Sequence, residues 1–135
     1  SPPDRFKKLY IDLEKLINQG IILSTYPVKK ELERQRDEIF DYYNKFKKLF
    51  VIPTQEEQLI VGKLVNHKDF LDWGGGDSEK HYADPYIVAL AKAYDLKVVT
   101  YESGRGNNTI LHACDVCSVQ CIKFIDFLRE EDLSY

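Results

Sequence analysis

Three acidic residues are candidates for chemistry. Glu31 borders the apolar stripe of a predicted helix, and Asp84 precedes a proline at the start of another. Glu102 follows the apolar run Val98–Thr100, at the carboxyl end of a predicted strand. Carboxylates in such places hold hard cations or transfer protons. A surface ion pair, a helix cap and a solvated loop acid would explain the same residues, so both interpretations stay open for each.

The three cysteines and one nearby histidine form a second group that could do chemistry. These residues are Cys114, Cys117, Cys121 and His112. The first two cysteines form a Cys-x-x-Cys pair, but structural zinc usually takes four ligands in two separated pairs. The three cysteines also share the spacing of one helix face, and free cysteine behaves as a small buried hydrophobe. We therefore expect core packing, with a zinc site as the alternative.

The remaining polar motifs are less specific. The stretch Gly74–Lys80 has three consecutive glycines and a lysine but lacks the spacing of a phosphate-binding P-loop. It is therefore predicted to be a connection. His67 and His81 stand in polar, loop-like surroundings, and we expect both to be solvated. Spacing alone indicates neither a Ser-His-Asp nor a Cys-His arrangement.

Helical periods alternate with short apolar runs along the chain. Helices are predicted over residues 4–18, 27–50, 54–65, 85–94, 111–119 and 125–131. Strands are predicted over residues 21–24, 50–52, 97–100 and 121–124. Thr54 and Glu57 form a capping-box pattern, and Gly20 can end the first helix. This alternation predicts an α/β fold with a mainly parallel sheet flanked by helices, which binds ligands beyond the carboxyl ends of its strands.

Length and composition indicate one globular domain over residues 1–135. The chain is 44% hydrophobic and 30% charged, within the range of folded domains. It has no apolar run of the roughly 18–20 residues that a membrane span needs, and its start resembles neither a signal nor a transit peptide. Three cysteines is an odd number without extracellular context, so we expect reduced thiols and a cytoplasmic location.

Charge is unevenly distributed along the sequence. The net charge is −3, which argues against a protein that coats nucleic acid nonspecifically. Residues 1–50 contain 11 Lys and Arg against 8 Asp and Glu, so the remainder, with 8 against 14, carries −6. This asymmetry suits a metal-dependent enzyme that acts on a polyanion, and it equally suits ordinary solvated faces.

Several motifs together resemble the PIN-like nucleases. The block Ala83–Ala93 followed by Val98–Glu102 is similar to a motif of a small bacterial branch, long catalogued as a domain of unknown function. Gly20–Ser24 ahead of Val28–Leu32 looks like the family's strand and Glu-bearing helix. Cys114–Glu130 resembles the carboxyl-terminal signature of the branch, so the similarity covers nearly the whole chain.

The resemblance implies a Mg²⁺- or Mn²⁺-dependent endoribonuclease, similar to the toxins of toxin–antitoxin pairs. It implies that Glu31, Asp84 and Glu102 bind the metal ion and act in catalysis. Such an ion lowers the pKa of an attacking water and neutralises charge on the phosphate. Without metal, close carboxylates repel one another, and at least one pKa should rise. The expected partners are an RNA substrate, an antitoxin protein and a second copy in a homodimer.

The chain departs from the family pattern before its first predicted helix. The family's first strand, an apolar run ending in Asp followed by Thr or Ser, is missing there. Leu9–Asp12 imitates such a run, but Phe6, Leu13 and Leu16 continue a helical period through it. We therefore expect a truncated or processed form, or a relative that has lost this strand, with a weakened metal site. His112 and Asp115 stay unassigned.

These observations support two hypotheses. In the first, an active nuclease contacts RNA phosphates with its basic second helix, although a solvated helix face explains that charge equally. Its basic residues are Lys29, Lys30, Arg34, Arg36, Lys45, Lys47 and Lys48. In the second, the chain is a non-catalytic PIN-like module that binds a protein through its aromatic residues. Candidate residues, which core packing would equally explain, are Tyr42, Tyr43, Phe46 and Phe50.

Overall fold

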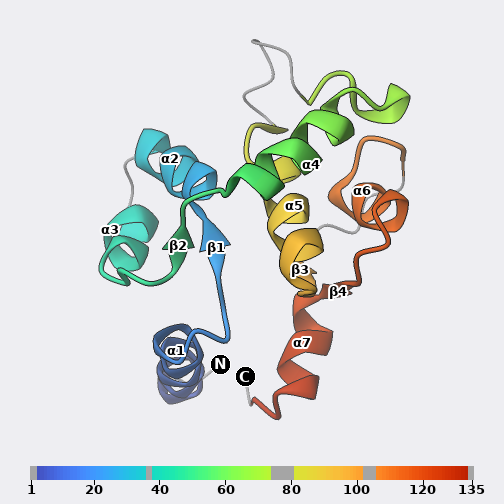
Figure 1. Cartoon of the computed structure of the whole chain (residues 1–135). Coiled ribbons are helices and arrows are strands. Elements are labelled where there is room, and N and C mark those ends of the chain that lie inside the picture. Colours follow the sequence, from blue (N-terminus) through green and yellow to red (C-terminus); the bar gives the residue numbers. More distant parts are fainter. Residues whose placement is uncertain (1–2, 36–37, 74–80, 102–105, 134–135) are drawn as a thin grey trace.

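The computed structural model describes residues 3–35, 38–73, 81–101 and 106–133. The helices are α1 Pro3–Asn18, α2 Tyr26–Gln35, α3 Glu38–Asn44, α4 Gln55–Val65, α5 Asp84–Tyr94, α6 Ile110–Val116 and α7 Phe124–Glu130. A short 3-10 helix, η1, spans Lys68–Phe70. The strands are β1 Ser24–Thr25, β2 Phe50–Val51, β3 Val98–Thr100 and β4 Cys121–Lys123. Figure 1 shows α5 in the middle of the molecule, with β1 and β2 on one side and β3 and β4 on the other.

The strands form two separate parallel pairs. β1 pairs with β2, Ser24 opposite Phe50, and β3 pairs with β4, Val98 opposite Cys121. The predicted mixed α/β fold with parallel strands is therefore confirmed. Within the described residues, however, the two pairs do not join into one sheet. The first predicted strand is also shorter than expected, because only Ser24 of residues 21–24 belongs to β1.

The prediction of one helix over residues 27–50 is wrong. α2 ends at Gln35, α3 covers Glu38–Asn44, and Phe50 already belongs to β2. After α3 the chain turns tightly, because the amides of Phe46 and Leu49 each bond the carbonyl three residues earlier, at 3.1 and 3.2 Å. These turns bury both side chains in a cluster with Ile17, which a straight helix could not do while also delivering Phe50 to a strand.

α4 begins with the predicted capping box. The backbone amide of Glu57 donates to Thr54 Oγ1 at 3.2 Å, and the Thr54 amide donates to Glu57 Oε2 at 3.0 Å. These reciprocal bonds satisfy two backbone donors that a helix start leaves without partners. The first helix also ends as predicted, because Gly20 adopts a left-handed φ of +75° just after α1.

The larger core lies around α5, whose residues Val88–Ala91 are all buried. The segment that follows α4 contributes to this core, since Phe70 and Trp73 are 0% and 3% exposed. Other members come from α4, β3 and α6, and they are Leu64, Val98, Ile110, Ala113 and Cys114.

The cysteines lie in or against this larger core, as predicted. Cys114 is fully buried, and Cys117 and Cys121 pack against the cluster. The three do not share one helix face, however, because α6 ends at Val116 and Cys121 belongs to β4. The predicted core role is therefore confirmed, but by a different local geometry.

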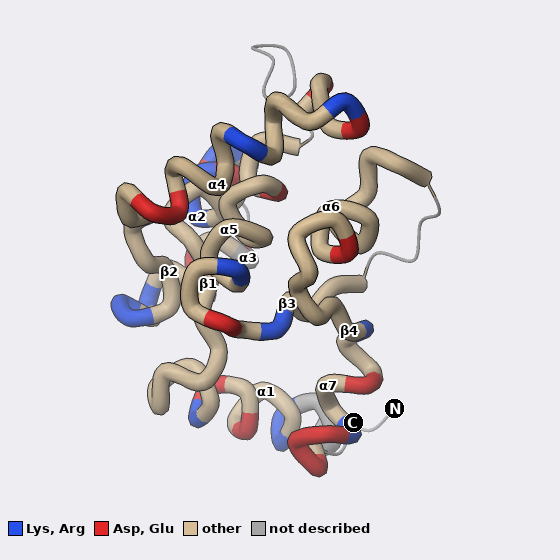
Figure 2. The backbone as a smooth tube through the Cα atoms, turned by 45° about the vertical axis from the view of Figure 1, so that its right-hand side comes forward, with Lys and Arg blue, Asp and Glu red and all other residues tan. Residues whose placement is uncertain are grey.

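Charges are mixed along the surface. Figure 2 shows basic and acidic positions interspersed on most helices. α2, for example, carries Lys29, Lys30 and Arg34 beside Glu31 and Glu33. None of the helices in the described part of the chain is both long and apolar enough to cross a membrane.

Candidate carboxylate site

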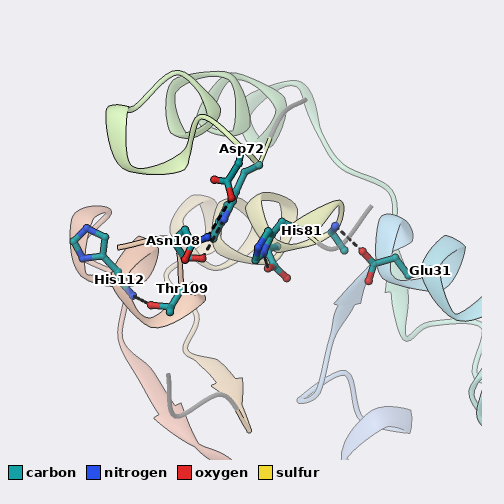
Figure 3. Close-up of polar contacts among 9 residues, drawn as sticks. Glu31, Asp72, His81, Asn108, Thr109 and His112 are labelled. Atoms are coloured by element: carbon teal, nitrogen blue, oxygen red, sulfur yellow. Dashed lines mark hydrogen bonds and ion pairs between the residues drawn. The ribbon is translucent and has the colours of Figure 1, made fainter. Parts of the chain in front are cut away.

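The fold brings Glu31 to the start of α5. Oε1 of Glu31, on α2, accepts a hydrogen bond from the backbone amide of Ala83 at 3.0 Å, across 52 residues of sequence (Figure 3). Ala83 is buried, and it directly precedes Asp84, the first residue of α5. The sequence-based cap assignment is therefore shifted by one residue, with Ala83 at the N-cap and Asp84 in the first turn. A carboxylate in that turn is stabilised by the helix dipole.

His81 holds the second carboxylate. Its Nδ1 lies 2.9 Å from Asp84 Oδ2, and its side chain is only 14% exposed. The imidazole stacks on Trp73, with ring centroids 5.5 Å apart and planes 16° apart. Trp73 is fixed in turn, because its Nε1 donates to the carbonyl of Asn108 at 3.2 Å. The expectation that His81 is solvated is therefore wrong. The three-residue separation of His81 and Asp84 is the sequence feature from which this contact could have been predicted.

The electrostatics of the site concern Glu31 above all. Burial raises the pKa of Glu31, and the negative charge of Asp84 raises it further. The hydrogen bond from Ala83 and the charges of Arg34 and His81 act in the opposite direction. The expected rise of at least one carboxylate pKa is thus found, although burial is a larger cause than the neighbouring acid.

The other predicted acids are not part of this arrangement as described. Glu102 lies outside the described residues. Asp12 lies on α1, where its Oδ2 accepts from Lys8 Nζ at 3.2 Å, so the helical interpretation of that segment is confirmed. Over residues 3–35, 38–73, 81–101 and 106–133, no group of three or more His, Cys, Asp or Glu side chains is arranged to hold a metal ion.

Two further histidines take structural positions that sequence reasoning missed. His112 Nε2 lies 2.9 Å from Asp69 Oδ2, which joins α6 to η1. This hydrogen bond is the largest cause of the lowered pKa of Asp69, and burial acts in the opposite direction. His67 caps η1, because its Nδ1 accepts from the Asp69 amide at 3.0 Å. Beside them Asn108 donates to Asp72 Oδ2 at 3.1 Å, and Figure 3 shows this group apart from Glu31.

Comparison with known proteins gives one finding. A protein-family model described as a domain of unknown function, DUF4411, matches residues 2–135. A search of curated proteins and a search of solved structures gave no match. Since the model covers nearly all of the 135 residues, the chain belongs to the DUF4411 family.

Proposed function

We propose that this chain is a PIN-like, metal-dependent endoribonuclease of the toxin type, inhibited by an antitoxin protein. Glu31, Asp84 and Glu102 are the proposed ligands of Mg²⁺ or Mn²⁺. The observation that carries the proposal is the contact between Glu31 and the amide of Ala83 at 3.0 Å. Because Ala83 directly precedes Asp84, this contact brings Glu31 to the start of α5, next to an acid that is far away in the sequence.

The two described carboxylates suit a hard cation. One oxygen of Glu31 bonds the Ala83 amide and one oxygen of Asp84 contacts His81. Each side chain therefore has a second oxygen that these contacts do not use. Mg²⁺ binds through few protein carboxylates and keeps several waters, so a third acid such as Glu102 would complete a suitable set. The ion would supply an activated water and neutralise charge on the scissile phosphate.

The separation of the two strand pairs in the described residues supports a PIN-like architecture with room for one further strand between them. A cavity of about 560 Å³ lies between the two strand pairs, bordered by Ser24 and Thr25 of β1 and by Val98 and Val99 of β3. Thr25 is fully buried, and its Oγ1 has no hydrogen-bond partner among the described residues. An additional strand between β1 and β3 would fill this apolar space and join the pairs into one parallel sheet. The resemblance implies that such a strand ends in an acid.

Calorimetric titration with Mn²⁺ tests the metal site. We expect saturable binding by the unmodified chain that Asp84→Asn and Glu31→Gln each remove. Glu33→Gln is the matched control, because Glu33 is an exposed acid on the same helix and should leave binding intact. RNA cleavage that requires Mn²⁺ and is lost in Asp84→Asn would support the nuclease. If the unmodified chain does not bind Mn²⁺, its own residues do not form the proposed site.

The division of the strands into two separate pairs also favours a second candidate function, a non-catalytic PIN-like module that binds another protein. The aromatic residues first considered for such an interface lie in or against the smaller core instead: Phe46 is 8% exposed, and Tyr42, Tyr43 and Phe50 pack against its cluster. Any interface would therefore use other surfaces. Mn²⁺-dependent RNA cleavage by the chain would exclude this alternative.

A further inference from the structure

We infer that one exposed face of α2, together with Tyr82, binds single-stranded RNA through base stacking and phosphate contacts. We call Tyr26, Lys30, Arg34 and Tyr82 the α2 track. The inference rests on the proposed function, because that function supplies the RNA. It goes further by assigning the surface of this chain that holds the RNA and the residues that stack on its bases.

Three members of the α2 track form a stripe along the helix. Tyr26, Lys30 and Arg34 are spaced four residues apart, so they lie on one helix face over about 12 Å. All three are exposed, and Tyr26 is 39% accessible to solvent. The stripe therefore offers one aromatic ring and two cations to a ligand lying along α2.

Cations and rings are already paired along the α2 track. Nζ of Lys30 lies 5.5 Å from the centroid of the Tyr26 ring. The guanidinium of Arg34 lies 5.0 Å from the ring of Tyr82, which precedes the first residues of α5. Such pairs keep the rings oriented while leaving cationic groups that can contact phosphate.

The α2 track lies beside the carboxylate site. Tyr82 is bonded to Ala83, whose amide donates to Glu31, and Glu31 follows Lys30 on α2. Arg34 is close enough to Glu31 to lower its pKa. An RNA strand bound to the α2 track would therefore pass the acids that we propose to hold the metal ion.

The chemistry of the α2 track favours a single strand. Aromatic rings stack on nucleobases only where those bases are unpaired and accessible, whereas duplex bases are already stacked within the helix. Lys and Arg supply contacts to the backbone phosphates. Glu33 is also exposed on α2, and its negative charge repels RNA phosphates. Glu33→Gln should therefore tighten RNA binding.

Binding without metal tests the inference separately from catalysis. The probe is a fluorescein-labelled 12-nucleotide RNA of mixed A and U, followed by anisotropy in EDTA. We expect Tyr82→Leu to raise Kd at least fivefold, the lower end of stacking losses of roughly 5- to 150-fold. Tyr82→Phe, which keeps the ring, should restore binding to within about twofold on the same stacking argument. Arg34→Gln should weaken binding and reduce the slope of log K against log salt by about 0.7.

Two matched controls lie on other elements. Tyr94→Leu removes an exposed tyrosine from the end of α5, and Arg129→Gln removes an exposed arginine from α7. Neither should change Kd by more than about twofold, since neither belongs to the α2 track. Thermal unfolding of every variant establishes that it is folded. If Tyr82→Leu does not fold, Arg34→Gln, which should weaken binding and reduce the salt slope, still tests the inference.

The possible outcomes separate the two proposals. Unchanged RNA affinity in folded Tyr82→Leu and Arg34→Gln overturns the inference, even where Mn²⁺-dependent cleavage supports the nuclease. Equal affinity for the duplex of the same sequence also overturns it. Equal competition by polyglutamate would indicate an acidic protein partner instead. RNA binding that depends on the α2 track, without any cleavage in Mn²⁺, supports the inference and contradicts the proposed function.

Discussion

At the scale of single residues, burial of Glu31 determines how stability should respond to pH. Because its pKa is raised by burial, the folded chain binds this proton more tightly than the unfolded chain. Stability from this group is thus fully present below the ordinary pKa of 4.5 and is lost as the pH rises through the folded value. In EDTA, Glu31→Gln should raise the free energy of unfolding at pH 7 relative to the wild-type chain. Urea denaturation between pH 4 and pH 8 measures this difference.

The control for this prediction is Glu33→Gln on the same helix. Glu33 is exposed, so its substitution should change stability little at any pH. The difference between Glu31→Gln and wild type should shrink towards pH 4, where Glu31 is protonated in both states. A Glu31→Gln protein that is less stable at pH 7 but equally stable at pH 4 would contradict a raised pKa.

The sequence predicted these residues unequally. Glu31 and Asp84 were singled out by type and position, but only the resemblance placed them in one site, because no spacing rule connects residues 31 and 84. The contact through Ala83 depends on how α2 packs near the start of α5. His81 was missed because its position depends on two contacts together, one with the nearby carboxylate of Asp84 and one with the ring of Trp73.

At the scale of elements, the start of α4 offers a direct test of local stability. Thr54 Oγ1 accepts from the Glu57 amide and also donates to Glu57 Oε2 at 2.8 Å. Glu57 is 1% exposed, so Thr54→Ala removes a helix cap and a hydrogen bond to a buried carboxylate. We expect a loss of about 1–3 kcal/mol in the free energy of unfolding, measured by urea denaturation.

Thr54→Ser is the matched control, because it keeps the hydroxyl that makes both contacts. It should retain most of the stability that Thr54→Ala loses. Equal losses in the two variants would mean that the methyl group of Thr54, rather than its hydrogen bonds, stabilises the start of α4.

Local signals predicted elements best where they were complete within a few residues. The capping box before α4 and the glycine after α1 are such signals, and both were confirmed. The helix predicted over residues 27–50 failed because its end depends on distant packing. Phe46 and Leu49 turn the chain inward to meet Ile17 of α1, and no glycine or proline marks the change.

At the scale of the whole molecule, parallel strands were predicted but their division into two pairs was not. Each strand was recognised from its own apolar run. Which strands pair is decided by contacts between segments far apart in the chain, such as Val98 with Cys121. The cavity between β1 and β3 likewise depends on contacts between distant segments. It follows from how the two pairs pack, and no single segment encodes it.

The two cores predict that the molecule opens in steps. Among the residues that the structure describes, the cluster around α5 contains nine buried residues, whereas that of Ile17, Phe46 and Leu49 contains three. The smaller cluster stabilises α1 and α3 less, because Ile17 of α1 belongs to it and Tyr42 and Tyr43 of α3 pack against it. The amides of α1 and α3 should therefore exchange hydrogen at a lower opening free energy than those of α5. Native-state hydrogen exchange measures both values.

A substitution in the larger core and one in the smaller core should give different patterns of hydrogen exchange. Val88→Ala, on the order of 2 kcal/mol destabilising, should accelerate exchange in α5 and leave α1 and α3 unchanged, because Val88 stays packed while the smaller core opens. Phe46→Ala should accelerate exchange in all three helices, since its contacts are lost in the partial opening and in complete unfolding. Equal acceleration of all helices by Val88→Ala would mean that the molecule unfolds as one unit.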